Sequence, residues 1–245
     1  MRAILYLAII IIFSSCKKNS SELIGKVPQE NVAKDTVKDK KYLKKDANGN
    51  VQVDGWLSNG KKHGVWKYYD KTSLKEVKRF SNDSLLYILD KDDYIIKGVL
   101  IKKINAYLPV PVSWDTNTTF DDKSTLLTSV KKCDDNLRYC PNVVWQYGEF
   151  KSESLEKDVT EYIEKFKAEY PNVKIFNVSK NTLISKESYI LRAYIDHQGV
   201  GIAQYYIWIK DKNNVIVGSA SCEATELEKN LHLFMTLVNS IKFIE

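Results

Sequence analysis

Cysteine and histidine are the residue types in this chain that could act as nucleophile and base. A cysteine enzyme needs a thiolate and a base within hydrogen-bond reach. The available bases are His197 and His232, and the sequence places neither of them at a spacing that marks a catalytic pair. A catalytic thiol would also have to stay reduced. We therefore expect no enzyme activity.

Metal and phosphate sites also lack their usual spacing. No two of His63, His197 and His232 stand at ligand spacing, and Cys133 and Cys140 lie too far apart for the close cysteine pair of a zinc site. The acidic doublets lack the alternating oxygen ligands and fixed glycine of a calcium loop. These doublets are Asp92-Asp93, Asp121-Asp122 and Asp134-Asp135. The glycine-rich turn of a phosphate site is missing too, so we expect no metal and no cofactor.

The charge balance argues against one large class of function. The 245-residue chain has a formal charge of +6, and its positive residues are nearly all lysine. Arginine, whose planar fork reads phosphates and base edges, occurs only at Arg2, Arg79, Arg138 and Arg192. We expect no nucleic-acid partner. The basic balance instead favours solubility or a weak attraction to an anionic membrane surface.

Residues 1–16 have the form of an export signal. A basic start at Arg2 precedes an apolar run, Ala3 to Phe13, that is shorter than the about 20 residues a bilayer-spanning helix needs. The ending FSSCKK resembles a bacterial lipoprotein signal, in which small residues precede the lipidated cysteine. That resemblance makes Cys16 the lipid-bearing N-terminus, although Phe13 stands where the pattern has a smaller aliphatic residue. The alternative is an ordinary secretory signal with an incidental cysteine.

The resemblance to a lipoprotein implies a location. The chain would sit in the cell envelope of a bacterium, anchored to a membrane through its N-terminal lipid, on the periplasmic or surface side. Lys17 follows the cysteine where aspartate would signal inner-membrane retention in some bacteria. The outer membrane is therefore the favoured location.

The remaining cysteines would meet an oxidising compartment after export. Cys133 and Cys140 close a short polar loop, and a bond between them would stabilise the fold by about 2 to 3 kcal/mol. We predict this disulfide, with Cys222 as a small buried residue. A bond from Cys133 or Cys140 to Cys222 is the alternative.

Residues 17–50 are polar and predict a flexible tether, with some helix between Asn31 and Lys45. Too few apolar residues recur here to bury a face. The lysines of this segment either touch lipid head groups or remain solvated. They are Lys40, Lys41, Lys44 and Lys45.

Residues 51–103 change to short strands divided by turns. Asn59-Gly60 is a strong hairpin signal because both residues tolerate positive φ. Glycine, tryptophan and tyrosine at fixed spacing from Gly55 to Tyr68 resemble the MORN-variant repeat of bacterial antitoxin-like and surface proteins. The resemblance implies a small all-β module that packs an open edge on the following domain.

Four aromatic residues of this segment form our candidate partner surface. They are Trp56, Trp66, Tyr68 and Tyr69. Such rings could make a platform for a protein or glycan partner. Strand alternation must turn some of them inward, so core packing is the alternative reading.

Residues 104–245 predict the main domain, built around a hairpin from Gly201 to Cys222. Its first arm alternates two sets of residues, as a strand does. The sets are Ile202, Gln204, Tyr206 and Trp208 against Ala203, Tyr205, Ile207 and Ile209. We expect this hairpin at the centre of an antiparallel sheet. We further expect its aromatic residues to lie under the last helix.

The other elements follow from periodicity and end signals. A proline-bearing strand at 107–112 should lie at a sheet edge or strand end, and another strand is predicted at 142–150. A helix at 154–170 has Ser154 as its cap and Pro171 as its stop. Strands are predicted at 173–179, 182–185 and 188–196, and a capping box of Thr225 and Glu228 should start the last helix.

The order of these elements resembles the PsbP-like fold, which includes the Mog and DcrB-like proteins. The likeness runs through the entry from Tyr107 to Trp114, the helix near Leu155, and the tail from Gly218 to Phe243. It implies an α+β fold, a central antiparallel sheet flanked by helices in an α-β-α arrangement. Proteins of this type are mostly binding and assembly factors, and fold alone does not fix function.

The sequence thus leads to two expectations of function. The first is a lipid-anchored envelope protein that binds a protein partner or assists assembly without catalysis. The second, motivated by the MORN-variant resemblance, is an immunity or antitoxin-like lipoprotein that neutralises a periplasmic toxin.

Overall fold

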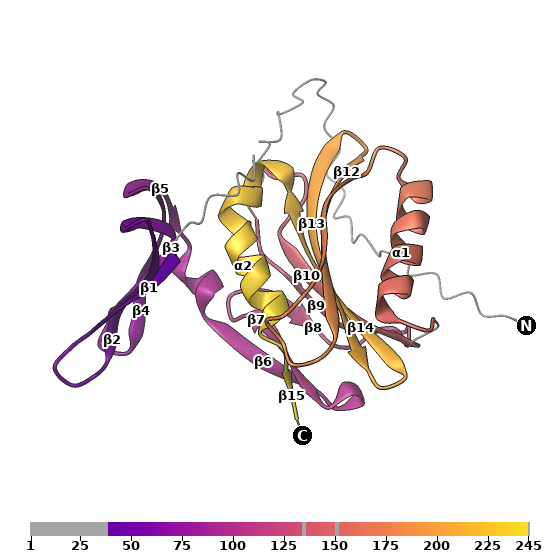
Figure 1. Ribbon diagram of the computed structural model, residues 1–245, viewed down its shortest axis with the longest axis horizontal. Helices are drawn as coiled ribbons and strands as arrows, with labels where there is room; N and C mark the ends of the chain where they lie inside the picture. The colour runs from indigo at the N-terminus through magenta and orange to yellow at the C-terminus, as the bar shows by residue number, and fades with distance from the viewer. Residues whose placement is uncertain (1–38, 134–135, 150–151, 245) are drawn as a thin grey trace, which may run out of the picture.

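The computed structural model describes residues 39–133, 136–149 and 152–244. The predicted signal, Cys16 and most of the predicted tether lie outside the described residues. Figure 1 shows a five-stranded sheet at one end of the molecule, joined by a short three-stranded sheet to a larger layered body.

The five-stranded sheet is a plain antiparallel meander with the order β1-β2-β3-β4-β5. Its strands are β1 Asp39–Lys45, β2 Val51–Ser58, β3 Lys61–Asp70, β4 Ser73–Ser81 and β5 Ser84–Leu89. The predicted turn at Asn59-Gly60 is confirmed, with φ values of 51° and 81°. Positive φ at both positions matches the twist of the flanking strands.

The predicted tether boundary at residue 50 is wrong, because Asp39–Lys45 already form a strand of the sheet. The segment 39–45, where we predicted tether or helix, is β1, paired along its length with β2. Because the segment is rich in lysine, it shows no hydrophobic periodicity by which a strand could be predicted. Backbone pairing holds it in place, together with the contact of Tyr42 with Trp66 at 5.2 Å between ring centroids and the ion pair of Lys41 with Asp54.

The predicted domain boundary at 103/104 is also displaced. After β5 come a 3₁₀ turn η1 (Lys91–Tyr94), β6 (Ile96–Ile101), a second 3₁₀ turn η2 (Lys102–Ile104) and β7 (Ala106–Pro111). Strand β6 pairs with β7, so both strands belong to the main domain. Sequence patterning missed this because the β6 segment continues the short-strand rhythm of the preceding sheet.

Strand β7 is the middle strand of the three-stranded sheet, not its edge. It pairs with β6 on one side and with β15 (Lys242–Phe243) on the other. The β15 pairing reaches only Ala106 and Tyr107. Pro109 and Pro111 therefore lie where β7 is paired on one side alone, which is where a missing N–H is tolerated.

The seven-stranded antiparallel sheet has the order β11-β12-β13-β14-β10-β9-β8. Its strands are β8 Asp115–Asn117, β9 Thr125–Val130, β10 Asn142–Glu149, β11 Lys174–Lys180, β12 Ser188–His197, β13 Val200–Asp211 and β14 Asn214–Glu223. The predicted hairpin is β13-β14 and is confirmed near the centre. The strand predicted at 182–185 is wrong, since those residues form a bend between β11 and β12.

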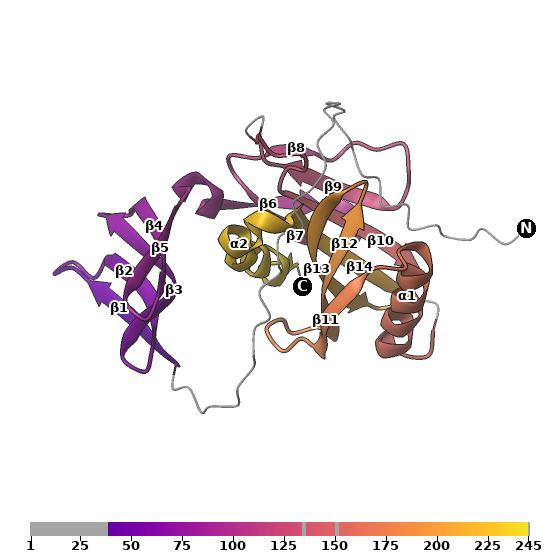
Figure 2. The same cartoon turned by 90° about the horizontal axis from the view of Figure 1, so that it is seen from above.

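Two helices cover opposite faces of this sheet, as Figures 1 and 2 show. They are α1 (Leu155–Glu169) and α2 (Leu227–Asn239). The predicted cap of α1 is confirmed, because the Ser154 hydroxyl accepts a hydrogen bond from the Lys157 N–H. The capping box of α2 is wrong: a 3₁₀ turn η3 (Ala224–Glu226) leads into that helix without a side-chain cap. The α+β class and the layered arrangement of helices on a central sheet are confirmed.

The two residue sets of β13 divide between the helices. Tyr205 and Ile207 pack on the α2 side, while Tyr206 and Trp208 pack under α1. The expectation that the last helix covers Tyr206 and Trp208 is therefore wrong. Alternation separates two faces but does not say which helix covers which.

The five-stranded sheet and the main domain share one hydrophobic core. Val65, Val77 and Leu89 of the sheet belong to the same buried cluster as Leu233 and Leu237 of α2. Because the two parts bury apolar area against each other, the N-terminal sheet is fixed to α2 and is not a separate bead.

Candidate functional site

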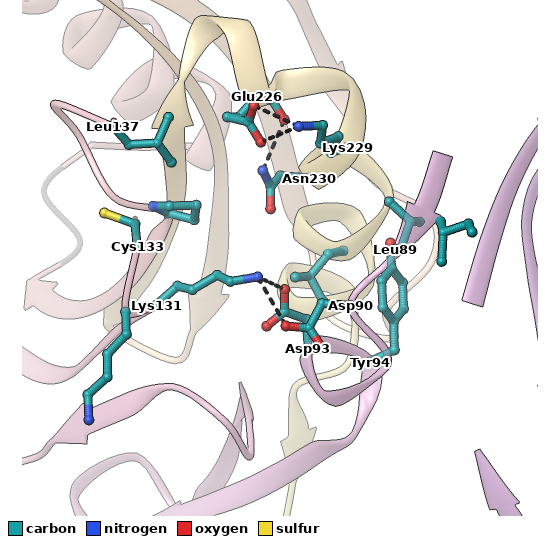
Figure 3. Close-up of a pocket in the computed structure, with 14 residues that line it drawn as sticks. Leu89, Asp90, Asp93, Tyr94, Lys131, Cys133, Leu137, Glu226, Lys229 and Asn230 are labelled. Carbon is teal, nitrogen blue, oxygen red and sulfur yellow. Dashed lines mark hydrogen bonds and ion pairs between the residues drawn. The ribbon is translucent and has the colours of Figure 1, made fainter. Parts of the chain in front are cut away.

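A cavity of about 330 Å³ lies where the five-stranded sheet meets the main domain, and we call it the junction cavity. Its walls come from the end of β5 and η1, from the segment around the cysteines, and from the start of α2, as Figure 3 shows. The residues that matter here are Ile88, Leu89, Asp90, Asp93, Lys131, Cys133, Glu226 and Lys229.

Asp93 and Lys131 form a charged contact across the junction cavity (Figure 3). Asp93 is only 5% exposed, and its Oδ1 accepts hydrogen bonds from Trp114 Nε1 at 2.8 Å and from the Ser113 hydroxyl at 3.2 Å. The Lys131 ammonium pairs with its other oxygen and lies 3.5 Å from Asp90. A buried carboxylate is tolerated only with such partners. This contact therefore holds η1 against Lys131, the residue that directly follows β9.

The start of α2 forms the opposite wall. Lys229 Nζ pairs with Glu226 at 2.9 Å, and the Asn230 side-chain amide donates to the Glu226 carbonyl oxygen at 2.9 Å. Tyr87 of β5 donates its hydroxyl to Glu228 at 3.3 Å. These contacts tie β5 to the helix and hold the cavity walls in one arrangement.

The disulfide between Cys133 and Cys140 borders the junction cavity and confirms that prediction. The loop is also docked, because the Arg138 guanidinium donates to the carbonyl oxygens of Gln198 and Gly199. The alternative bond to Cys222 is wrong: that residue is a free cysteine, fully buried in the core. Burial raises the pKa of the Cys222 thiol to about 12, which leaves it protonated.

His232 of α2 lies between the helix and the five-stranded sheet, beside Tyr94 at 6.1 Å between ring centroids. Burial, and then the positive charges of Lys67 and Arg79, lower the pKa of His232 to about 4. The imidazole is therefore neutral at ordinary pH.

The structure does not bring the four predicted surface aromatics together. Trp66, at 2% exposure, is buried, which corrects its assignment to a partner surface. Its ring lies against Gly55 and between Tyr42 and Phe80. These residues form a small core on the outer face of the five-stranded sheet, which is the face turned away from α2.

The other three aromatics divide between the two faces. Tyr68 shares the outer face with Trp66, and the Lys78 ammonium lies 5.4 Å from its ring centroid. Trp56, 45% exposed, pairs across the strands with His63, on the face that turns toward α2. Tyr69 lies near Asp54 on that same face. Only Trp56 and parts of the two tyrosines can meet a partner.

Exposed apolar residues gather instead on β5, which the sequence reading missed. Leu85, Leu86 and Ile88 are 49%, 44% and 69% exposed. The signal was present in the sequence as an uncharged run, SLLYIL, between Asp83 and Asp90. It was obscured because the same pattern fits a strand buried on one face.

Within the described ranges, no group of three His, Cys, Asp or Glu side chains is arranged to hold a metal ion. Over the same residues, no helix is long and apolar enough to cross a membrane.

Comparisons with known proteins give structural likeness only. No protein-family model and no curated protein sequence matches the chain. The chain is similar in structure to the cyanobacterial PsbP protein CyanoP from Synechocystis, with a TM-score of 0.49, 12% identity, and coverage of 61% of this chain and 92% of that one.

Two further solved structures are similar. One is PA94 from Pseudomonas aeruginosa, a protein of unknown function described as a putative regulator, with a TM-score of 0.45, 12% identity and coverage of 61% of this chain and 98% of that one. The other is LpqN from Mycobacterium tuberculosis, described as involved in cell envelope biogenesis, with a TM-score of 0.44, 15% identity and coverage of 56% and 82%. Likeness at this level concerns the fold and assigns neither an activity nor a partner.

Proposed function

We propose that this chain is a lipid-anchored bacterial envelope protein that binds a protein partner and performs no chemistry. The observation that carries the proposal is the junction: a cavity bordered by a disulfide loop, a helix start and a strand with three exposed large apolar residues. Exposed apolar residues beside a hollow are a common mark of a protein interaction site.

The state of the reactive side chains supports a binding role over catalysis. Cys133 and Cys140 are joined to each other, and Cys222 is buried and protonated. The charged groups at the cavity hold one another in ion pairs, as Lys131 does with Asp93.

The lipid anchor rests on the sequence of the first 16 residues and its resemblance to a lipoprotein signal. The disulfide agrees with this, because such bonds persist in oxidising compartments outside the cytoplasm. A lipidated Cys16 would keep the junction cavity near a membrane surface, where resident envelope proteins are the available partners.

Photo-crosslinking in living cells tests the partner claim. A photoreactive amino acid replaces Lys229, at the rim of the junction cavity, and in a matched strain it replaces Lys165, an exposed lysine of α1. We expect a discrete adduct with one envelope protein from position 229 and none from position 165. The same set of adducts at both positions, or no adduct from 229, would contradict the proposal.

The identity of the crosslinked protein separates the two forms of the proposal. A resident envelope protein favours an assembly role. An imported toxin, together with growth protection by this chain, favours the immunity role, for which the MORN-variant resemblance is the support.

A further inference from the structure

Edge strands present unpaired backbone N–H and C=O groups, and proteins usually protect them with charged residues. Nearly every edge strand of the described chain follows this rule. The protecting residues include Lys44 in β1, Lys97 in β6, Asp115 in β8, Lys174 in β11 and Lys242 in β15.

Strand β5 is the exception. Its sequence SLLYIL contains no charged residue. Within the described residues, no strand pairs with the edge of β5 that points away from β4. Leu85 and Ile88 stand on the outer face of the sheet, opposite Phe80 and Lys78 of β4, and both are exposed. An uncharged, apolar, open edge is a template for another strand.

We propose that β5 takes up an extended apolar segment of the partner protein as a sixth strand of the sheet. This inference rests on the proposed partner-binding function and names its mode. Main-chain hydrogen bonds to the free side of β5 supply affinity, and Leu85, Leu86 and Ile88 cover apolar side chains of the incoming segment.

The position of β5 joins this edge to the junction cavity. Ile88 and Leu89 line the cavity at the end of the strand (Figure 3 labels Leu89). A segment paired along β5 therefore runs to the cavity rim, where one of its side chains enters. The contact of Tyr87 with Glu228 keeps the strand fixed to α2 while its outer side is occupied.

Charge decides between a foreign segment and a second copy of this chain. Exposed Asp83 and Asp90 flank β5 at its two ends. In the antiparallel register that pairs all six residues of two copies, Leu86 faces Tyr87, and Asp83 then faces Asp90 at both ends of the pairing. Opposed like charges destabilise a strand pair. The edge therefore suits a foreign segment with a lysine or arginine beside its apolar run.

The crosslink from position 229 provides the first test. In one variant Leu85→Lys and Ile88→Lys protect the edge of β5, and in the matched control Phe176→Lys and Val178→Lys make the same change on β11, where both residues are exposed. We expect the adduct to be lost in the β5 variant and kept in the β11 control. Circular dichroism melting of both variants verifies that they fold.

A synthetic peptide gives a second test on the purified full chain. The probe alternates valine and threonine with a lysine at each end, and its control has glutamate ends. With the lysine peptide, we expect hydrogen exchange of the amides in residues 84–89 to slow, and with the glutamate peptide to slow much less.

The outcomes separate the two proposals. An adduct that persists in the β5 variant, or unchanged exchange with the lysine peptide, overturns strand addition and leaves partner binding intact. If position 229 gives no adduct in the protein with an unchanged β5, partner binding itself is overturned. If sedimentation shows a dimer of the unmodified chain and a monomer of the β5 variant, a second copy of the chain occupies the edge. This result overturns the proposal of a foreign segment.

Discussion

Replacing Gly55 with alanine should destabilise the five-stranded sheet through one contact. A Cβ atom built at Gly55 lies 2.4, 2.6 and 2.8 Å from three atoms of the Trp66 ring. Carbon atoms pack at about 3.5 to 4.0 Å, so the closest of the three contacts overlaps by about 1 Å or more. The ring cannot move aside freely, because Tyr42 and Phe80 lie against it at 5.2 and 6.2 Å between centroids.

Overpacking of this kind costs about 1 to 3 kcal/mol. Urea unfolding followed by circular dichroism should therefore show the midpoint for Gly55→Ala lowered by about 1 M, for a slope near 2 kcal/mol per M. The slope itself should not change, since neither folded nor unfolded state gains much surface.

A double-mutant cycle tests the stated cause. Trp66→Phe shrinks the ring that the new Cβ meets, so Gly55→Ala should cost less in that background, with a coupling of at least about 1 kcal/mol. Additive free energies, or a single substitution that costs less than about 0.5 kcal/mol, would refute the reasoning from the Trp66 contact.

Three further changes have defined outcomes. Cys16→Ala should release the protein from membranes into the soluble fraction. If the variant stays bound to membranes through a carbonate wash, the proposed lipid anchor at Cys16 is contradicted. Trp208→Ala should cost about 3 to 5 kcal/mol because that ring is buried under α1, whereas Trp56→Ala, on an exposed ring, should cost under about 1 kcal/mol; equal melting temperatures of the two variants would contradict this burial. His232 has a folded pKa of about 4 and an unfolded value near 6.5, so the unfolded state binds more protons between these values and stability falls as pH drops through that window. His232→Gln should remove about 2 kcal/mol of that acid-induced loss, and urea midpoints at pH 7 and pH 4.5 that change equally in both proteins would exclude the histidine as its cause.

Local pattern predicted the elements whose periodicity is strong. The alternation of β13 identified both of its faces, and Ser154 with Pro171 identified the ends of α1. The pairing of Cys133 with Cys140 followed from the short loop between them. In these cases the physical cause lies within a few residues of the prediction.

Elements fixed by distant contacts were missed. Strand β1 has little apolar pattern and exists because β2 offers it an edge, and β6 belongs with β7 although it follows the rhythm of the earlier strands. The prediction of an aromatic surface was wrong for a similar reason. Gly55, on the neighbouring strand, has no side chain and leaves the space in which the Trp66 ring is buried. The junction cavity joins residues more than a hundred positions apart, such as Leu89 and Lys229, and no local signal marks such a meeting.

The core shared by the five-stranded sheet and α2 limits how this protein can be divided or rearranged. If the chain were cut at Asp90 and the two pieces separated, the residues by which the pieces share this core would be exposed to water. They include Val65, Val77 and Leu89 on one piece and Leu233 on the other. Neither piece could be exchanged for a homologous module without redesigning the facing residues, and heat should melt both in a single cooperative transition. A pull applied to β5 would load α2 through this shared core, so the sheet and the helix should move as one unit.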